Sequence, residues 1–79
     1  MTMTGNYMKH VRVRKSLNAS GVSKRMGFSR PSLSKWENGN ALPSEDVLQA
    51  WATAINLSPQ SLAAVLNIRS WEVEPAELS

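Results

Sequence analysis

Apolar side chains recur along the chain at intervals of three or four residues, which is the period of an α-helix. The first helix is predicted over residues 7–17, where Met8, Val11 and Lys15, with the stem of Arg12, mark the inward face. A second, shorter helix is predicted over residues 19–26, with the side chain of Asn18 as its N-terminal cap. The pattern therefore begins with two consecutive helices.

A third helix follows after a very short connection. Gly27 is suited to end the second helix, because glycine adopts the left-handed conformation without the steric cost of a Cβ atom. Ser29 is a good cap for the next helix, and Pro31 lies in its first turn, where no backbone N–H is needed. Phe28, Leu33 and Trp36 are predicted to point inward. Two helices joined so closely pack at a steep angle, and the second projects outward.

Two more helices complete the pattern. Ser44 is the expected cap of the fourth, and Ser58 with Pro59 is the expected start of the fifth. Their inward positions are predicted to be Leu48, Trp51, Ala52, Ile55, Leu62, Val65 and Leu66. The sequence therefore predicts an all-α fold of five short helices in one compact domain.

The two ends of the chain lack this period. Residues 1–6 are predicted to be a mobile N-terminus, residues 7–67 the helical domain and residues 68–79 a C-terminal tail. In the tail, Trp71 and Val73 alternate with glutamates, which is typical of a strand. One hypothesis is that residues 70–74 pair with a second copy as a short dimerisation strand. The other is that the tail folds back and Trp71 covers its own core.

Composition excludes several classes of function. The chain has 79 residues, no cysteine and a single histidine, His10, so we expect no metal site and no cofactor. It contains no nucleophile–base pair and no phosphate-binding glycine loop, so an enzyme is not expected. Its apolar runs are far shorter than the roughly 18 residues that span a bilayer, so we expect no membrane association.

The charges are divided unevenly along the chain. Residues 1–44 hold eight lysines and arginines against one glutamate, whereas residues 45–79 hold one arginine against five acidic residues. The expected outward face of the third helix carries Arg30, Ser34 and Lys35 and no carboxylate. Such a basic helix fits the major groove of B-DNA, where Arg and Lys bond guanine and serine adapts to several bases.

At this point the sequence resembles a known family. Residues 21–44, GVSKRMGFSRPSLSKWENGNALPS, resemble without a gap the helix-turn-helix of the XRE family, the Cro and phage-repressor type. The resemblance extends from about Met8 to Leu57 and implies a lambda-repressor-like domain with its helix-turn-helix core over residues 19–38. It also implies a cytoplasmic, nucleoid-associated protein of bacterial or phage origin.

The resemblance assigns roles to individual positions. Arg12 and Glu37 match the arginine and the acid that form a structural ion pair in this family. The family's base-reading positions are occupied by Arg30, Pro31, Ser34 and Lys35. Its phosphate-binding positions correspond to Asn18, Ser32, Asn38 and Asn40.

The chain departs from the family pattern at three places. Ala19 replaces a glutamine, so a polar anchor on DNA is missing. Ser23 replaces a small alanine at the helix crossing, which is tolerable if its hydroxyl bonds back along the helix. Pro31 has no N–H and offers only apolar contact, for instance with a thymine methyl group.

We therefore expect a transcriptional repressor that binds a pseudo-palindromic operator as a homodimer. The apolar residues outside the helix-turn-helix are the expected dimer interface: Leu62, Leu66, Ile68, Trp71 and Val73. Two alternatives remain open. One is an antitoxin that binds a toxin partner and regulates its own promoter, and the other is a helix-turn-helix scaffold that has lost DNA binding and binds only proteins. A toxin or a co-regulator is the possible protein partner.

Overall fold

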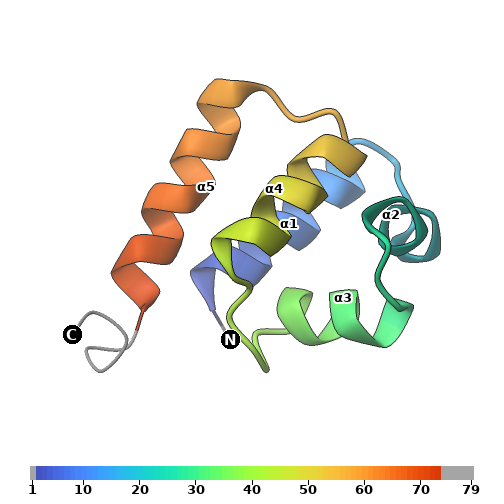
Figure 1. Cartoon of the computed structure of the whole chain (residues 1–79), viewed down its shortest axis with the longest axis horizontal. Helices are drawn as coiled ribbons and strands as arrows, with labels where there is room; N and C mark the ends of the chain where they lie inside the picture. Colours follow the sequence, from blue (N-terminus) through green and yellow to red (C-terminus); the bar gives the residue numbers. More distant parts are fainter. Residues whose placement is uncertain (1, 74–79) are drawn as a thin grey trace.

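The computed structural model describes residues 2–73, and in this part of the chain it contains five α-helices and no strand. The helices are α1 (Met3–Arg14), α2 (Ala19–Met26), α3 (Arg30–Glu37), α4 (Glu45–Ala54) and α5 (Pro59–Glu72), shown in Figure 1. The predicted all-α fold of five helices is confirmed for these residues. None of the five helices is both long and apolar enough to cross a membrane.

Side-chain caps determine where the helices begin. Asn18, Ser29, Ser44 and Ser58 each accept a hydrogen bond from the backbone N–H three residues further on. Each bond satisfies one of the N–H groups that have no partner inside the helix. The four caps predicted from the sequence are thus confirmed, and Thr2 does the same for α1 by accepting a hydrogen bond of 2.9 Å from Gly5 N.

The core forms where the five helices meet. Trp51 of α4 is completely buried, and each of the other helices contributes at least one buried apolar side chain to the same cluster. These are Met8, Val22, Met26, Leu33 and Val65, joined by Leu48, Ala52, Ala54 and Ile55 from α4 and its end. Burial of this apolar surface is the main source of stability in so small a domain.

The N-terminal segment does not match its prediction. Residues 3–6 form the first turn of α1, in which Thr4 and Gly5 are buried, so the prediction of a mobile start is wrong for them. Gly5 packs against the carbonyl groups that end α3, where a larger residue would not fit. Residue 1 lies outside the described residues.

The C-terminal segment differs as well. Because α5 continues to Glu72, the predicted strand is wrong over residues 70–72, and the predicted domain boundary at residue 67 falls inside a helix. Trp71 is 82% exposed, so the alternative in which it covers its own core is also wrong. Residues 74–79 lie outside the described residues.

Two side chains predicted to point inward lie at the surface. Lys15 is exposed at the end of α1. Phe28 is 40% exposed, although its ring packs edge-on against that of Trp36 with centroids 5.2 Å apart. In both cases a helical or near-helical period was extended past the end of the helix that supported it, and the period has no meaning there.

Candidate nucleic-acid interface

The turn between α2 and α3 determines the direction of α3. Gly27 has a φ of +80°, and its N–H donates to the carbonyl of Lys24 at 3.1 Å. The next N–H, of Phe28, donates to the carbonyl of Ser23 at 3.0 Å. Together these bonds close the C-terminal end of α2 in the left-handed conformation that glycine adopts readily. The chain then leaves α2 at a steep angle and enters α3.

The departure at Ser23 is accommodated locally. Ser23 is buried at 3% exposure, and its hydroxyl donates a hydrogen bond of 3.0 Å to the carbonyl of Ser20. A buried hydroxyl with a partner avoids the cost of an unsatisfied polar group. The hydroxyl of Ser23 thus bonds back along the helix, as the sequence pattern required for a serine at this helix crossing.

One face of α3 is buried and the other is exposed. Leu33 is completely buried and Glu37 is only 6% exposed, which turns the opposite face of α3 to solvent. The four predicted base-reading residues are all exposed: Arg30, Pro31, Ser34 and Lys35. Pro31 lies in the first turn of α3 and removes no hydrogen bond from the helix.

Arg12 and Glu37 form an ion pair between α1 and the end of α3. Arg12 donates from Nε to Oε2 of Glu37 at 2.7 Å and from Nη2 to Oε1 at 3.0 Å. Its Nη1 donates to the carbonyl of Leu17 at 2.8 Å, between α1 and α2. This pairing turns the only carboxylate of α3 inward, so Arg30 and Lys35 are the charged groups of its exposed face.

The four predicted phosphate-binding residues differ in how free their side chains are. Asn18 is exposed at the start of α2, and its Oδ1 is occupied by a 2.6 Å hydrogen bond from Gly21 N. Asn38 is exposed at the end of α3 and donates from Nδ2 to Ser34 Oγ at 3.1 Å. Asn40 is exposed in the loop that follows, whereas Ser32 is half-buried and its hydroxyl lies 3.0 Å from that of Ser29.

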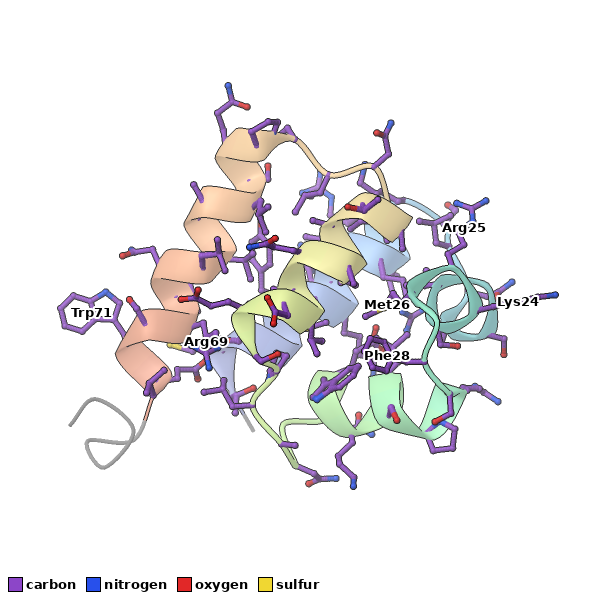
Figure 2. The ribbon with its side chains drawn as sticks, viewed as in Figure 1. Lys24, Arg25, Met26, Phe28, Arg69 and Trp71 are labelled. Atoms are coloured by element: carbon purple, nitrogen blue, oxygen red, sulfur yellow. The ribbon has the colours of Figure 1, made fainter. Side chains whose placement is uncertain are left out.

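The predicted dimer residues all lie on α5 or at its end. Leu62 and Leu66 are half-buried against the core, and Ile68 and Val73 are also half-buried. Only Trp71 extends freely, and Figure 2 shows it pointing away from the helices on the side opposite α2. The five residues therefore do not form one continuous exposed strip.

Two arginines with structural contacts were missed by sequence reasoning. Arg69 of α5 donates from Nε to the carbonyl of Pro43 at 2.6 Å and so holds the loop after α3 (Figure 2). Arg25 donates from Nη1 to the carbonyl of Ala54 at 3.3 Å and connects α2 to α4. The only sequence signal for Arg69 was that it is the single basic residue of the acidic half.

Among the residues that the structure describes, no three histidine, cysteine or acidic side chains are grouped so that they could hold a metal ion. The polar groups of the candidate interface are guanidinium, ammonium, hydroxyl and amide groups, which bond to anionic oxygens and to base edges.

Two helices joined by a short glycine turn, with an exposed polar second helix, define the helix-turn-helix class. The helix-turn-helix family model matches residues 8–62, and the chain belongs to this family. Two Mycobacterium tuberculosis proteins, from strains CDC 1551 / Oshkosh and ATCC 25618 / H37Rv, are each 35% identical over 75 residues. Both are described as uncharacterized HTH-type transcriptional regulators.

The match to these relatives covers 95% of this chain but 51% of each of theirs, so the chain spans about half of their length. No solved structure matches the chain.

Proposed function

We propose that this chain is a sequence-specific DNA-binding transcriptional regulator that inserts α3 into the major groove. The observation that carries the proposal is the exposed face of α3, which presents Arg30, Ser34 and Lys35 and no carboxylate. A solvated helix face of no function would tolerate acidic side chains, whereas a face opposed to phosphates would not. Membership of the helix-turn-helix family and the names of the relatives support the same function.

Within this proposal, each exposed residue of α3 has a chemical task. Arg30 and Lys35 donate hydrogen bonds to the O6 and N7 atoms of guanine, and Ser34 bonds whichever base edge it meets. Pro31 makes apolar contact with a thymine methyl group. Because one helix makes few such contacts, the specificity of a single chain is low.

The phosphate contacts orient the protein on the duplex. The amide groups of Asn18, Asn38 and Asn40 donate to phosphate oxygens on either side of the groove, and Ser32 does so if its hydroxyl leaves Ser29. The backbone N–H groups at the start of α2 add a weak positive end beside Asn18. These contacts add affinity but do not distinguish one sequence from another.

A second copy supplies the missing specificity. We place the dimer contact at the C-terminal end of α5, centred on the exposed side chain of Trp71, with the two copies of α3 about 34 Å apart on a pseudo-palindromic operator. Binding then represses transcription by occluding the promoter. The large exposed surface of Trp71 supports this choice, because an indole ring in water is unfavourable unless a partner covers it.

Selection of bound sequences from a random DNA pool tests the proposal. We expect a pseudo-palindrome whose half-sites lie about ten base pairs apart. Replacing Arg30 or Lys35 with alanine is expected to lower affinity for the selected site by about tenfold to a hundredfold and to relax one base position. Lys9→Ala is the matched control, because Lys9 is exposed on α1 and outside the proposed interface.

Two results would contradict the proposal. The DNA-binding function fails if no duplex is bound at 50 mM salt or if binding does not weaken as salt rises. The dimer fails separately if Trp71→Asp, in a variant that remains folded by circular dichroism, leaves the sedimentation coefficient and the selected palindrome unchanged. A protein-binding role, such as that of an antitoxin, is favoured if a partner is bound while DNA is not.

A further inference from the structure

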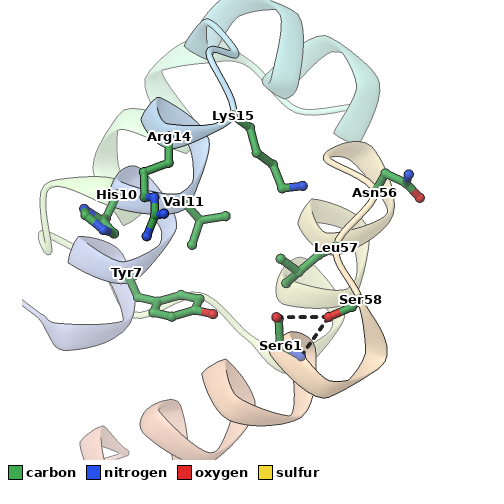
Figure 3. Close-up of a pocket in the computed structure, with 9 residues that line it drawn as sticks. All are labelled: Tyr7, His10, Val11, Arg14, Lys15, Asn56, Leu57, Ser58 and Ser61. Carbon is green, nitrogen blue, oxygen red and sulfur yellow. Dashed lines mark hydrogen bonds between the residues drawn. The ribbon is translucent and has the colours of Figure 1, made fainter.

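A groove opens between α1 and the segment that joins α4 to α5 (Figure 3). Its volume is about 530 Å³, which lies within the range of roughly 300–1,000 Å³ typical of sites for small molecules. None of the proposed base-reading or phosphate-binding residues lines it. The groove is therefore separate from the proposed DNA interface.

Arg14 and Lys15 bring positive charge to the groove at the C-terminal end of α1. Arg14 lies one turn after His10 on the same face of α1, because positions four apart in a helix are neighbours on its surface, and Lys15 follows directly after the end of the helix. Among the described residues, no aspartate or glutamate lines the groove. Its cationic side is therefore not neutralised by the residues around it.

The side chains of Arg14 and Lys15 differ from the arginines that the structure shows in contact with protein oxygens. Arg12, Arg25 and Arg69 each donate a hydrogen bond to a protein oxygen. Within residues 2–73, by contrast, the side chains of Arg14 and Lys15 have no hydrogen bond and no ion pair, although the backbone N–H of Lys15 donates to the carbonyl of Val11. No described residue occupies their side-chain donors, which can bind a ligand.

The wall of the groove is apolar and held in place. Tyr7, Val11 and Leu57 line it, and all three are half-buried against the core. The ring of Tyr7 packs edge-on against the buried ring of Trp51, with centroids 6.4 Å apart and an interplanar angle of 66°. A wall supported in this way needs little rearrangement to accept a flat ligand.

Hydroxyl groups border the other end of the groove. The Ser58 and Ser61 hydroxyls are hydrogen-bonded to each other at 3.0 Å. In Figure 3 the hydroxyl of Tyr7 points toward this pair, and Lys15 extends into the space beside Leu57. Apolar wall, cations and hydroxyls thus surround one space, as they do in sites that orient a small polar ligand.

We infer that this groove binds a small organic anion, in which a carboxylate or phosphate is attached to a flat, partly apolar body. Arg14 and Lys15 hold the anionic group, His10 adds a further donor, and Tyr7 and Leu57 pack against the body. The cations of the groove indicate a negatively charged ligand, and the apolar wall indicates a flat body. Because guanidinium groups bind both carboxylates and phosphates in a bidentate manner, experiment must distinguish the two anionic groups.

The site lies where a ligand can affect the helix-turn-helix. Lys15 is three residues before Asn18, which caps α2, and Leu57 belongs to the link between α4 and α5. A bound anion connects these two segments, and it changes the affinity for DNA by the same factor by which DNA changes the affinity for the anion. Ligand binding itself requires no DNA, so its failure is distinguishable from failure of the proposed function.

Two-dimensional NMR titration of the whole chain tests the inference, with salicylate, adenosine 5′-monophosphate and inorganic phosphate as probes at constant ionic strength. We expect saturable shifts of the amides of the groove for at least one ring-bearing probe, with a dissociation constant below about 1 mM. Salicylate and the nucleotide distinguish carboxylate from phosphate. Inorganic phosphate should bind at least about tenfold more weakly, because it cannot contact the apolar wall.

Variants test the assignment of residues. Arg14→Gln combined with Lys15→Gln should weaken binding of the ring-bearing probe at least about tenfold. Tyr7→Phe should leave the fold intact and weaken binding of the probe less than the double variant does. Lys9→Gln, which removes an exposed charge of the same helix outside the groove, should change the affinity less than about twofold.

Three outcomes would overturn the inference: no saturable binding by any probe, equal loss in the Lys9 variant, or equal affinity for inorganic phosphate. If the double variant instead weakens binding to DNA and no probe binds, the cluster is part of the duplex contact.

Discussion

The carboxylate of Glu72, in the last turn of α5, binds the first turn of α1 through Thr4. Its Oε1 accepts hydrogen bonds from the backbone N–H of Thr4, at 2.7 Å, and from the Thr4 hydroxyl. Its Oε2 accepts a hydrogen bond of 2.6 Å from the N–H of Met3. A carboxylate 68 residues away in the sequence thus satisfies free N–H groups at the positive end of α1.

Replacing Glu72 with glutamine should therefore destabilise the domain. The amide keeps the shape of the side chain but removes the charge that strengthens the hydrogen bonds to Thr4 and Met3. We expect the free energy of unfolding to fall by about 1–2 kcal/mol, measured by urea denaturation. Thr4→Val, which removes only the hydroxyl partner, should lower it less. Unchanged stability in both variants would contradict a stabilising role for this contact.

The same contact makes stability depend on pH. Burial raises the pKa of Glu72, but the hydrogen bonds from the Thr4 hydroxyl, Thr4 N–H and Met3 N–H outweigh burial and bring the pKa below its ordinary value of 4.5. The contribution of a carboxyl group with a lowered pKa is complete above its unfolded value and is lost as the pH falls through the folded value. The difference in stability between the wild type and Glu72→Gln should therefore be constant near neutral pH and shrink below pH 4.5. A difference that is independent of pH would contradict this assignment.

The two helical glycines should respond very differently to alanine. A Cβ on Gly5 would overlap the carbonyl oxygen of Trp36, a backbone atom that cannot move without displacing the end of α3. We expect Gly5→Ala to lower the free energy of unfolding by about 1–3 kcal/mol or more. On Gly21 the nearest atom is the side-chain Oδ1 of Asn18 at 3.1 Å, so the matched Gly21→Ala variant should stay within about 1 kcal/mol of wild type. Equal thermal unfolding of the two variants would exclude the close packing of Gly5.

Ser16 occupies a backbone conformation that suits glycine better. Its φ is +59°, in the left-handed region that costs a residue with a Cβ about 1–2 kcal/mol. We expect Ser16→Gly to raise the free energy of unfolding by about 0.5–1 kcal/mol, after the larger backbone entropy of glycine in the unfolded chain is subtracted. Asn56 has a φ of +56°, but asparagine tolerates this region, so Asn56→Gly should gain less. Denaturant midpoints of the two variants test this order.

The ion pair of Arg12 and Glu37 should show strong coupling. The two side chains are only 12% and 5% exposed, so removing one leaves the other charged and buried. We expect Glu37→Leu or Arg12→Met alone to cost about 3–5 kcal/mol, and the double variant to recover most of that loss. A double-mutant cycle in urea measures the coupling. Additive losses would show that the pair is already open to solvent.

Local chemistry made four helix starts predictable. Asn18, Ser29, Ser44 and Ser58 bond N–H groups only three residues away, so a short window of sequence contains both partners. The turn at Gly27 was predictable for the same reason, because the conformation of glycine is a local property. The exposed face of α3 followed from the period of the helix and from the buried position of Leu33.

The two ends of the fold were not predictable in this way. The sequence by itself determined the all-α class, the caps and the outward residues of α3, because these depend on neighbours within one or two turns. Only the tertiary structure decided that α1 begins at Met3 and that α5 continues to Glu72, because each end is stabilised by hydrogen bonds to the other across 68 or more residues. The tertiary structure also decided the groove beside Arg14, because the two sides of the groove come from α1 and from the link between α4 and α5. Side chains that are distant in sequence share a space only once the helices have packed.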